Sequence, residues 1–198
     1  RNAKDIEDDK KIMKSIWKLM DEADNVFGQK SKSFDVKKLN ARFVMHGMKP
    51  PSSFRQIDTK LIAKKHFSFT RNKLEYMTDK LCTKYKKLKH GKFPGFSLWK
   101  ECLAGNMAAW DEMEQYNKYD VLSLEELYEA LLPWDDSINF TMYFEDDVCS
   151  CGSTEFKKNG FYYTNASKYQ KYQCKNCGAE FRGKKNLIKG KKLRKTSR

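Results

Sequence analysis

The sequence of 198 residues predicts an α/β protein in which a helix-rich domain with few strands precedes a small β module. In the first 134 residues, apolar side chains recur mainly at three- and four-residue spacing, which is typical of amphipathic helices. From residue 149 on, aromatic residues lie between turn-forming residues, which is typical of short β-hairpins. We therefore expect a first domain at 1–134, an acidic linker at 135–148, a β module at 149–182 and a basic tail at 183–198.

Local patterns predict each element of the first domain. Its first helix carries apolar residues at helical spacing, namely Ile12, Met13, Ile16, Leu19 and Met20. Pro133 ends the last helix, because proline lacks the N–H that a continuing helix needs. The expected elements, in chain order, are a helix at 8–22, a strand at 25–28, a helix from Asp35 to about Gly47, a strand ending at 57–59 that leads into a helix, a short helix at 74–81 and a long helix at 107–132.

Short hairpins with aromatic faces are expected in the β module. Asn159-Gly160 and the stretch at 165–167 are typical turn sequences. The aromatic residues between and beside these turns are Phe156, Phe161, Tyr163, Tyr169, Tyr172 and Phe181.

Positive charge is concentrated at the C-terminal end of the chain. The net charge is +14, and residues 149–198 hold 14 Lys and Arg residues against two acidic ones, Glu155 and Glu180. Such a module typically binds the phosphate backbone of nucleic acids, because Lys and Arg displace condensed counterions. The alternative is a tail that only improves solubility. No apolar run reaches the ~20 residues of a membrane-spanning helix, so we expect no membrane partner.

Four of the six cysteines have the spacing of a metal site. Cys149 and Cys151 form Cys-x-Cys-Gly, and Cys174 and Cys177 form Cys-x-x-Cys-Gly after 22 intervening residues. Two such turns can place four thiolates around one tetrahedral Zn²⁺, which a small module with little core needs for stability. This arrangement resembles the zinc ribbon family, although the common ribbon has two residues between the first pair. A disulfide pair is the alternative, and Cys82 and Cys102 are interpreted as core residues.

The zinc would be structural, because four cysteines leave no open coordination position for water. Lysines interleaved with tyrosines around it predict binding of a nucleic-acid strand, although the same aromatic residues can form the hairpin core. The candidate nucleic-acid-binding residues are Lys30, Lys157, Lys158, Lys168, Lys171, Lys175, Arg182, Lys184 and Lys185.

A second constellation lies on the long helix. Tyr116 and Asp120 are four residues apart and therefore share one helix face. A carboxylate that holds Mg²⁺ beside a polar group that orients water is what a metal-dependent phosphodiester hydrolase needs. This spacing also occurs by chance in many helices.

The wider sequence context carries a family resemblance. Ser33-Phe34-Asp35, Asp58, Phe67, Leu98-Trp99-Lys100 and the run at 116–128 together resemble exonucleases of the ribonuclease H-like superfamily, in the tyrosine variant of the DEDD class found in phages and bacteria. The resemblance covers about residues 8–134, and similar proteins also carry an appended zinc ribbon. It implies an incomplete ribonuclease H-like α/β domain and hydrolysis of the 3′ ends of nucleic acid, with DNA as the expected substrate and two Mg²⁺ ions as cofactors. It also implies an intracellular location, in the cytoplasm of a bacterial or phage-infected cell.

The resemblance implies roles for individual residues. Asp35 would match the aspartate of the second motif and Asp120 that of the third, both as Mg²⁺ ligands, while Tyr116 would position the attacking water. Asp58 lies where similar proteins carry an Asp-Thr pair, and its role is either in the site or as a helix cap.

Two positions depart from the family pattern. The family's first motif, Asp-x-Glu after an apolar strand, has only Asp5-Ile6-Glu7 as a counterpart, which we interpret as a coincidental helix start. Gln29-Lys30 also replaces a pair that usually ends in asparagine. The chain begins at Arg1, so we expect the missing strands on a removed or separately encoded segment or on a partner chain.

The number of carboxylates available for Mg²⁺ predicts how active the site can be. Two Mg²⁺ ions carry four positive charges and Asp35 with Asp120 offset two, so we expect weak Mg²⁺ binding and little or no cleavage by these residues alone. Three hypotheses remain: a Mg²⁺-dependent 3′–5′ exonuclease or its C-terminal part, a non-catalytic nucleic-acid-binding protein with a degenerate nuclease domain, and a structural subunit of a replication or viral assembly.

Overall fold

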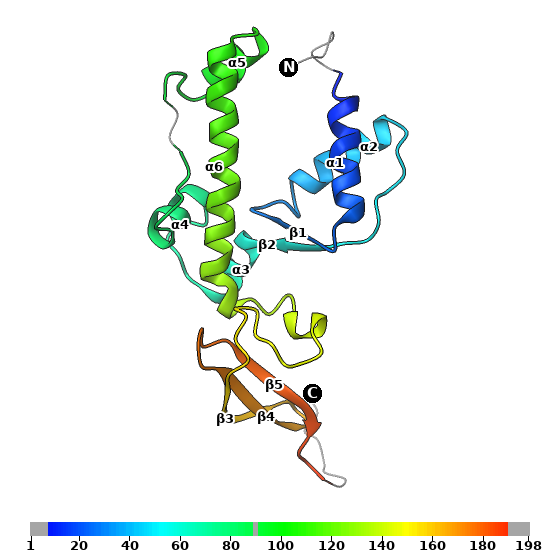
Figure 1. Ribbon diagram of the computed structural model, residues 1–198, viewed down its shortest axis with the longest axis vertical. Helices are drawn as coiled ribbons and strands as arrows, with labels where there is room; N and C mark the ends of the chain where they lie inside the picture. The colour runs from blue at the N-terminus through cyan, green and yellow to red at the C-terminus, as the bar shows by residue number, and fades with distance from the viewer. Residues whose placement is uncertain (1–7, 89–90, 190–198) are drawn as a thin grey trace, which may run out of the picture. The chain divides into compact units, whose positions relative to one another are not determined.

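The computed structural model describes residues 8–88 and 91–189, which form two compact units (Figure 1). The first unit comprises residues 1–130 and the second residues 131–198. Each unit has its own strands, with a parallel pair in the first and an antiparallel sheet in the second.

A β-α-β arrangement opens the first unit after helix α1. In chain order the elements are α1 (Lys10–Glu22), β1 (Asn25–Gly28), α2 (Asp35–Met45), β2 (Arg55–Asp58) and α3 (Thr59–His66). β1 and β2 are parallel, with Gly28 opposite Asp58 at their carboxyl ends. α2 provides the crossover that parallel strands need. These helices and strands confirm the expected elements.

α1 and α2 pack on a shared apolar core. Met13 and Met20 of α1 lie with Val36 and Phe43 of α2, and Ile16 and Trp17 pack beside them. Ile12 and Leu19 were also expected on the buried face of α1 and are exposed instead. Each of them precedes a buried methionine by one residue, a rotation of about 100° around the helix that turns them toward solvent.

The second half of the first unit contains α4 (Leu74–Leu81), α5 (Ser97–Leu103) and α6 (Met107–Leu131). The sequence pattern did not predict α5, because its seven residues bury only Leu98 and Cys102 and are too few to show a helical period of apolar residues. Both side chains pack with Ala109 of α6 in one small core. α6 continues into a 3-10 turn, Leu132–Trp134, which contains Pro133 as expected.

A three-stranded antiparallel sheet dominates the second unit. A short 3-10 helix at Phe140–Tyr143 lies in the acidic stretch, followed by β3 (Phe156–Tyr163), β4 (Lys168–Cys174) and β5 (Glu180–Asn186) in the order β3-β4-β5. The predicted turn at Asn159-Gly160 is wrong, because these residues form an irregularity inside β3. Gly160 has a φ of 70°, which suits glycine at a bulge. The turn expected at 165–167 is confirmed by a hydrogen bond from Thr164 N to Ser167 O.

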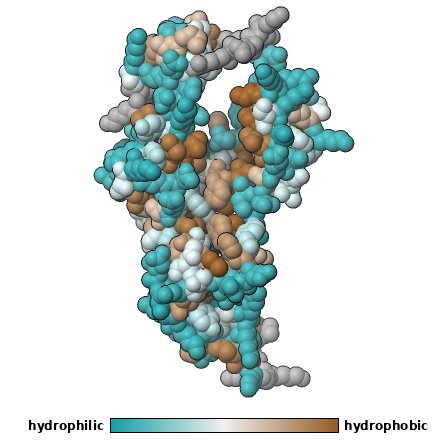
Figure 2. All heavy atoms as spheres, in the orientation of Figure 1, coloured by the Kyte–Doolittle hydropathy of each residue, from teal (hydrophilic) through white to brown (hydrophobic). Residues whose placement is uncertain are grey.

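Hydrophilic residues cover most of the face seen in Figure 2, and hydrophobic residues show in smaller patches. None of the described helices combines the length and the apolar character that crossing a membrane requires.

The α1–α2 core makes a prediction about stability. Phe43 is 2% exposed in that core. Phe43→Ala should lower the free energy of unfolding by about 3–5 kcal/mol, because it removes apolar contacts and leaves a cavity. Urea denaturation of the full chain, followed by circular dichroism of the helices, measures this change.

Val44→Ala is the matched control, because Val44 follows on the same helix and is 75% exposed. It should change the free energy of unfolding by less than about 0.5 kcal/mol. Equal effects of the two substitutions would contradict the packing of α2 described above.

Candidate functional site

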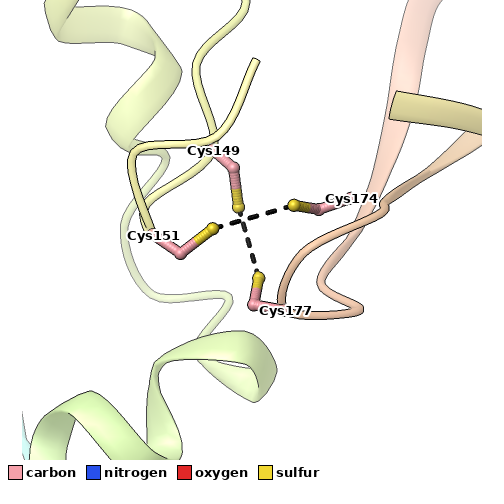
Figure 3. Close-up of side chains that lie close together, drawn as sticks. All are labelled: Cys149, Cys151, Cys174 and Cys177. Atoms are coloured by element: carbon pink, nitrogen blue, oxygen red, sulfur yellow. Dashed lines mark hydrogen bonds between the residues drawn. The ribbon is translucent and has the colours of Figure 1, made fainter. Parts of the chain in front are cut away.

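Four cysteine sulfurs converge on one point in the second unit (Figure 3). The Sγ atoms of Cys149, Cys151, Cys174 and Cys177 all lie within 4.8 Å of one another. The Cys149–Cys177 and Cys151–Cys174 pairs are 3.5 and 3.7 Å apart. In a tetrahedral site with Zn–S bonds of about 2.3 Å, neighbouring sulfurs are about 3.8 Å apart. The cluster can therefore hold a metal ion such as Zn²⁺, as the spacing of the cysteines predicted.

The two turns that carry these cysteines differ in length. In the first, the N–H of Gly152 donates to the carbonyl of Cys149 across three residues; in the second, the N–H of Gly178 donates to that of Cys174 across four. Both glycines have a φ near 80°, which side-chain-bearing residues rarely adopt. The first turn is thus one residue tighter, which accommodates the shorter Cys-x-Cys spacing without displacing either sulfur from the cluster.

The environment of the cluster favours a thiolate at two of its positions, because hydrogen bonds lower the pKa of Cys151 and of Cys174. Burial raises the pKa of the Cys149 thiol to about 12. Burial also acts on Cys174, but the backbone N–H groups of Cys177 and Asn176 outweigh it and lower the pKa of that thiol to about 6. Thiolates are the form in which cysteines bind metal ions.

Aromatic residues complete the small core around the cluster. Phe156 of β3 and Phe181 of β5 pack against the cysteines with their rings edge to face, 5.3 Å between centroids. This core is small, so a bound metal ion would supply much of the stability of the second unit.

The candidate nucleic-acid-binding residues of the sheet fall into three groups. Lys171 and Lys175 form ion pairs with Glu180 and Glu155, which are the acidic residues of this segment. Lys168 and Arg182 lie over aromatic rings. The exposed residues without an ion pair in the described part of the chain are Lys157, Lys158, Lys184 and Lys185.

Cations and aromatic rings lie together on both faces of the sheet. The Arg182 guanidinium lies 4.6 Å from the Tyr169 ring and 5.4 Å from the Tyr162 ring. The ammonium of Lys168 lies 3.7 Å from the Phe161 ring centroid. Tyr162 and Phe161 are 46% and 43% exposed, so these rings are accessible rather than core. Such pairs match the surfaces that bind single-stranded nucleic acid by stacking and charge.

In the first unit, Tyr116 and Asp120 meet around one cation. The Nζ of Lys87 lies 2.8 and 2.9 Å from the two carboxylate oxygens of Asp120. It also lies 4.5 Å from the centre of the Tyr116 ring. Tyr116 in turn packs edge to face on Trp99. The expected shared face of Tyr116 and Asp120 is thus occupied by a lysine that the sequence analysis did not single out.

The environment keeps Lys87 charged. Burial acts to lower its pKa, but hydrogen bonds with Asp120 and Tyr116 outweigh burial and raise the pKa above its usual value. A divalent ion on Asp120 would have to displace a cation that this site already stabilises.

Two further acidic residues of α6 hold the backbone of the segment that carries Lys87. Glu126 accepts hydrogen bonds from the backbone N–H groups of Thr83, Lys84 and Tyr85, the shortest at 2.6 Å. Glu112 accepts from Gly91 and Lys92 at 2.9 and 3.0 Å. Each of these two carboxylates is thus satisfied by backbone N–H groups of a distant segment of the chain.

Asp58 acts as a cap at the carboxyl end of β2. Its carboxylate accepts hydrogen bonds from the backbone N–H groups of Lys60, the first turn of α3, and of Lys30 and Lys32 in the β1–α2 loop. The sequence left two roles open for Asp58, and these hydrogen bonds show that it caps α3. The same carboxylate also holds the β1–α2 loop.

Asp35 is the first residue of α2 and is exposed. Its carboxylate forms no ion pair within the described part of the chain. Among the described residues, only the four cysteines form a group of three or more potential metal ligands. Asp5 and Glu7 lie outside the described residues, so their interpretation as a helix start stays a prediction.

Lys87, Glu112 and Glu126 are the residues that the sequence analysis missed as partners in this region. Their partners lie about 20 to 43 residues away in sequence, and no local period marks such pairs. The only available signal is that Glu112, Tyr116, Asp120 and Glu126 recur on one side of α6.

The first unit has a match among known protein families. The sequence model described as the RNase_H superfamily matches residues 1–132. This match covers two thirds of the chain, ends close to the boundary between the two units and leaves out the cysteine cluster. No curated protein matches the chain, and no solved structure matches it.

The cysteine cluster predicts metal-dependent folding of the second unit. We expect the purified chain to bind one Zn²⁺, and a chelator to unfold the β3–β5 sheet while the first unit stays folded, because the metal links both cysteine turns. Metal analysis and NMR spectra recorded before and after chelation measure both effects.

Cys174→Ser should reproduce the effect of the chelator, whereas Cys102→Ser, in the core of α5 and α6, should leave the zinc content unchanged. A chain that keeps its sheet signals after complete removal of metal would contradict the prediction.

The hydrogen bonds of Glu126 to the 83–85 backbone should depend on pH. The backbone N–H groups of Lys84, Tyr85 and Thr83 lower the pKa of Glu126 from 4.5 to about 2. Because the folded pKa lies below the unfolded one, the stabilisation is complete above the usual range of glutamate and is lost as the pH falls toward 2. An NMR titration of the Glu126 carboxyl carbon should give a midpoint near 2, with loss of protection of the 83–85 amides at the same pH.

In the Glu126→Gln variant, the amides at 83–85 should show no transition in that range. A midpoint near 4.5 in the unsubstituted chain would show that the hydrogen bonds to the 83–85 backbone are absent in solution.

Proposed function

The chain belongs to the RNase_H superfamily, and from this premise we propose that it is a metal-dependent 3′–5′ exonuclease, or a part of one, that acts on DNA. The helix-rich α/β architecture of the first unit, with its parallel strands, fits a ribonuclease H-like domain. The superfamily supports a nuclease-like fold in general. The direction of cleavage, the choice of DNA and the roles of individual residues are parts of the proposal.

In this proposal Asp35 and Asp120 hold Mg²⁺ and Tyr116 orients the attacking water. Carboxylate oxygens are the ligands that Mg²⁺ prefers, and the ion would stabilise the charge that develops on the scissile phosphate. Asp35 is exposed and is therefore accessible to a hydrated ion. Tyr116 and Asp120 both contact the ammonium of Lys87, which places the two side chains in one neighbourhood, and in this proposal the Tyr116 hydroxyl orients water beside the metal.

The second unit would hold the nucleic-acid strand. Its cation–aromatic pairs at Arg182 and Lys168 offer stacking surfaces, and exposed lysines on β3 and β5 offer contacts to phosphates. A metal ion bound by the four cysteines would hold the sheet rigid, so that its cations and aromatic rings could contact the strand together.

One observation favours a second candidate, a nucleic-acid-binding protein without catalysis. Both oxygens of Asp120 are paired with Lys87, and that pair is less than a third exposed. A carboxylate paired in this way is neutralised without a metal ion. A degenerate nuclease domain that keeps its fold through such a pair would still bind nucleic acid.

Hydrolysis of labelled DNA tests the two candidates. Single-stranded DNA labelled at its 5′ end is incubated with the full chain, with and without Mg²⁺. The exonuclease predicts a ladder of progressively shorter labelled products that requires Mg²⁺. Asp120→Asn and Asp35→Asn should each reduce the rate at least about 100-fold, because each removes a ligand of the metal. Asp35→Asn is the sharper variant, since the Asp35 carboxylate forms no ion pair among the described residues.

Glu125→Gln is the matched control, since Glu125 is exposed on the same helix as Asp120. It should leave the rate unchanged. Binding of DNA in Mg²⁺-free buffer without cleavage in any Mg²⁺ concentration would favour the second candidate. Cleavage that survives both aspartate substitutions would overturn the assignment of the metal ligands.

A further inference from the structure

A pocket at the carboxyl ends of β1 and β2 is lined mainly by lysines. Its volume is about 340 Å³, comparable with the smaller ligand pockets of proteins. The lining residues are Lys30, Lys32, Ser33, Lys37, Asp58, Lys60, Leu61 and Lys64. They come from the β1–α2 loop, from α2 and from the end of β2 with α3, so the fold rather than one local stretch gathers them.

The five lysines of this pocket have no acidic partner among residues 8–88 and 91–189. None of them forms an ion pair with another residue in the part of the chain that the structure describes. Elsewhere in the chain, lysines such as Lys87 and Lys171 are paired with acidic residues. Five unpaired ammonium groups around one hollow repel one another and create a positive potential that an anion would relieve.

The single acidic residue of the pocket is directed to the backbone. Asp58 is 5% exposed, and its carboxylate accepts the N–H groups of Lys30, Lys32 and Lys60 at 2.9, 3.2 and 3.0 Å. These hydrogen bonds hold the backbone of three of the lysines while their side chains line the pocket. Asp58 therefore positions the lysines, and it neutralises at most one of the five charges.

The backbone of the β1–α2 loop is strained at one of the pocket lysines. Lys30 has a φ of 66°, in the left-handed region that costs a side-chain-bearing residue about 1 kcal/mol or more. No glycine occupies this position, where glycine would relieve the strain. Strained backbone of this kind is concentrated at binding and catalytic sites.

We propose that this pocket binds phosphate groups of a nucleic-acid strand. Several cations on three segments match a polymer that presents successive phosphates, rather than a single charge. Only the identity of the polymer rests on the proposed function, and the pocket is separate from the β3–β5 surface considered above. Of the five lysines, only Lys30 was singled out from the sequence.

Binding of DNA at several salt concentrations tests the proposal. The full chain is titrated with a fluorescein-labelled 20-nucleotide single strand in Mg²⁺-free buffer without chelator, so that no cleavage occurs and the second unit keeps its metal. The triple variant Lys32→Gln, Lys60→Gln and Lys64→Gln keeps every backbone N–H that Asp58 holds. It should bind about tenfold more weakly at 50 mM salt, and the slope of log K against log salt should become shallower by about 2, since each lost phosphate contact contributes about 0.7.

The control variant removes the same charge elsewhere. Lys10, Lys11 and Lys14 are exposed on α1 and lie outside the pocket. Their substitution by Gln should change neither the affinity nor the slope as strongly. Equal effects of the two triple variants would overturn the proposal, since they would reflect net charge alone.

Other outcomes separate this inference from the proposed function. If the unsubstituted chain binds DNA and the pocket variant binds equally well, the pocket inference fails and the proposed function stands. If the chain binds no DNA, both fail. Titration with inorganic phosphate and with a deoxynucleoside monophosphate, followed by the amide signals of Lys32 and Lys60, addresses a small free ligand. A variant that loses these small anions but keeps DNA affinity would overturn the proposal in favour of a free phosphate compound.

Discussion

The hydrogen bonds to the carboxylate of Asp58 are the interactions on which the junction of β1, β2 and α3 in the first unit depends. It lies at the buried end of β2 and accepts hydrogen bonds from backbone N–H groups of two segments, the start of α3 and the β1–α2 loop. A buried carboxylate needs several such donors, since an unpaired charge at this depth is costly. The loop therefore adopts the conformation that supplies them, including the left-handed backbone of Lys30.

α6 uses its acidic residues in a similar way. Glu126 and Glu112 hold backbone N–H groups of the segment before α5, and Asp120 holds the side chain of Lys87 between them. Many of the negative charges of the first unit are thus used within the fold. The lysines around the pocket have no acidic partner within the described residues, and this gives a chain with a net charge of +14 a specific place at which to bind an anion.

The second unit also presents a cationic surface, but its fold depends on the cysteine cluster rather than on buried carboxylates. Its core is too small for hydrophobic packing to dominate, and four cysteines can bring both turns together through one metal ion. The two acidic residues of segment 149–198, Glu155 and Glu180, are paired with Lys175 and Lys171, and the other described cations of the sheet lie exposed or over aromatic rings. The two units thus offer separate cationic surfaces, and both suit the handling of a nucleic-acid strand that membership of the RNase_H superfamily suggests.

Local periodicity and spacing were enough to predict most helices and strands, the cysteine cluster and the shared face of Tyr116 and Asp120, because each depends on residues near in sequence or on fixed ligand chemistry. α5 was missed because seven residues hold too few apolar positions to show a period, and Gly160 signalled a turn where the pairing of β3 with β4 makes it a bulge. The pairing of Lys87 with Asp120, the backbone contacts of Glu126 and the lysine pocket were decided only by the tertiary structure. Each joins residues from separate segments of the chain, and the energy that selects such contacts arises only when packing brings those segments together.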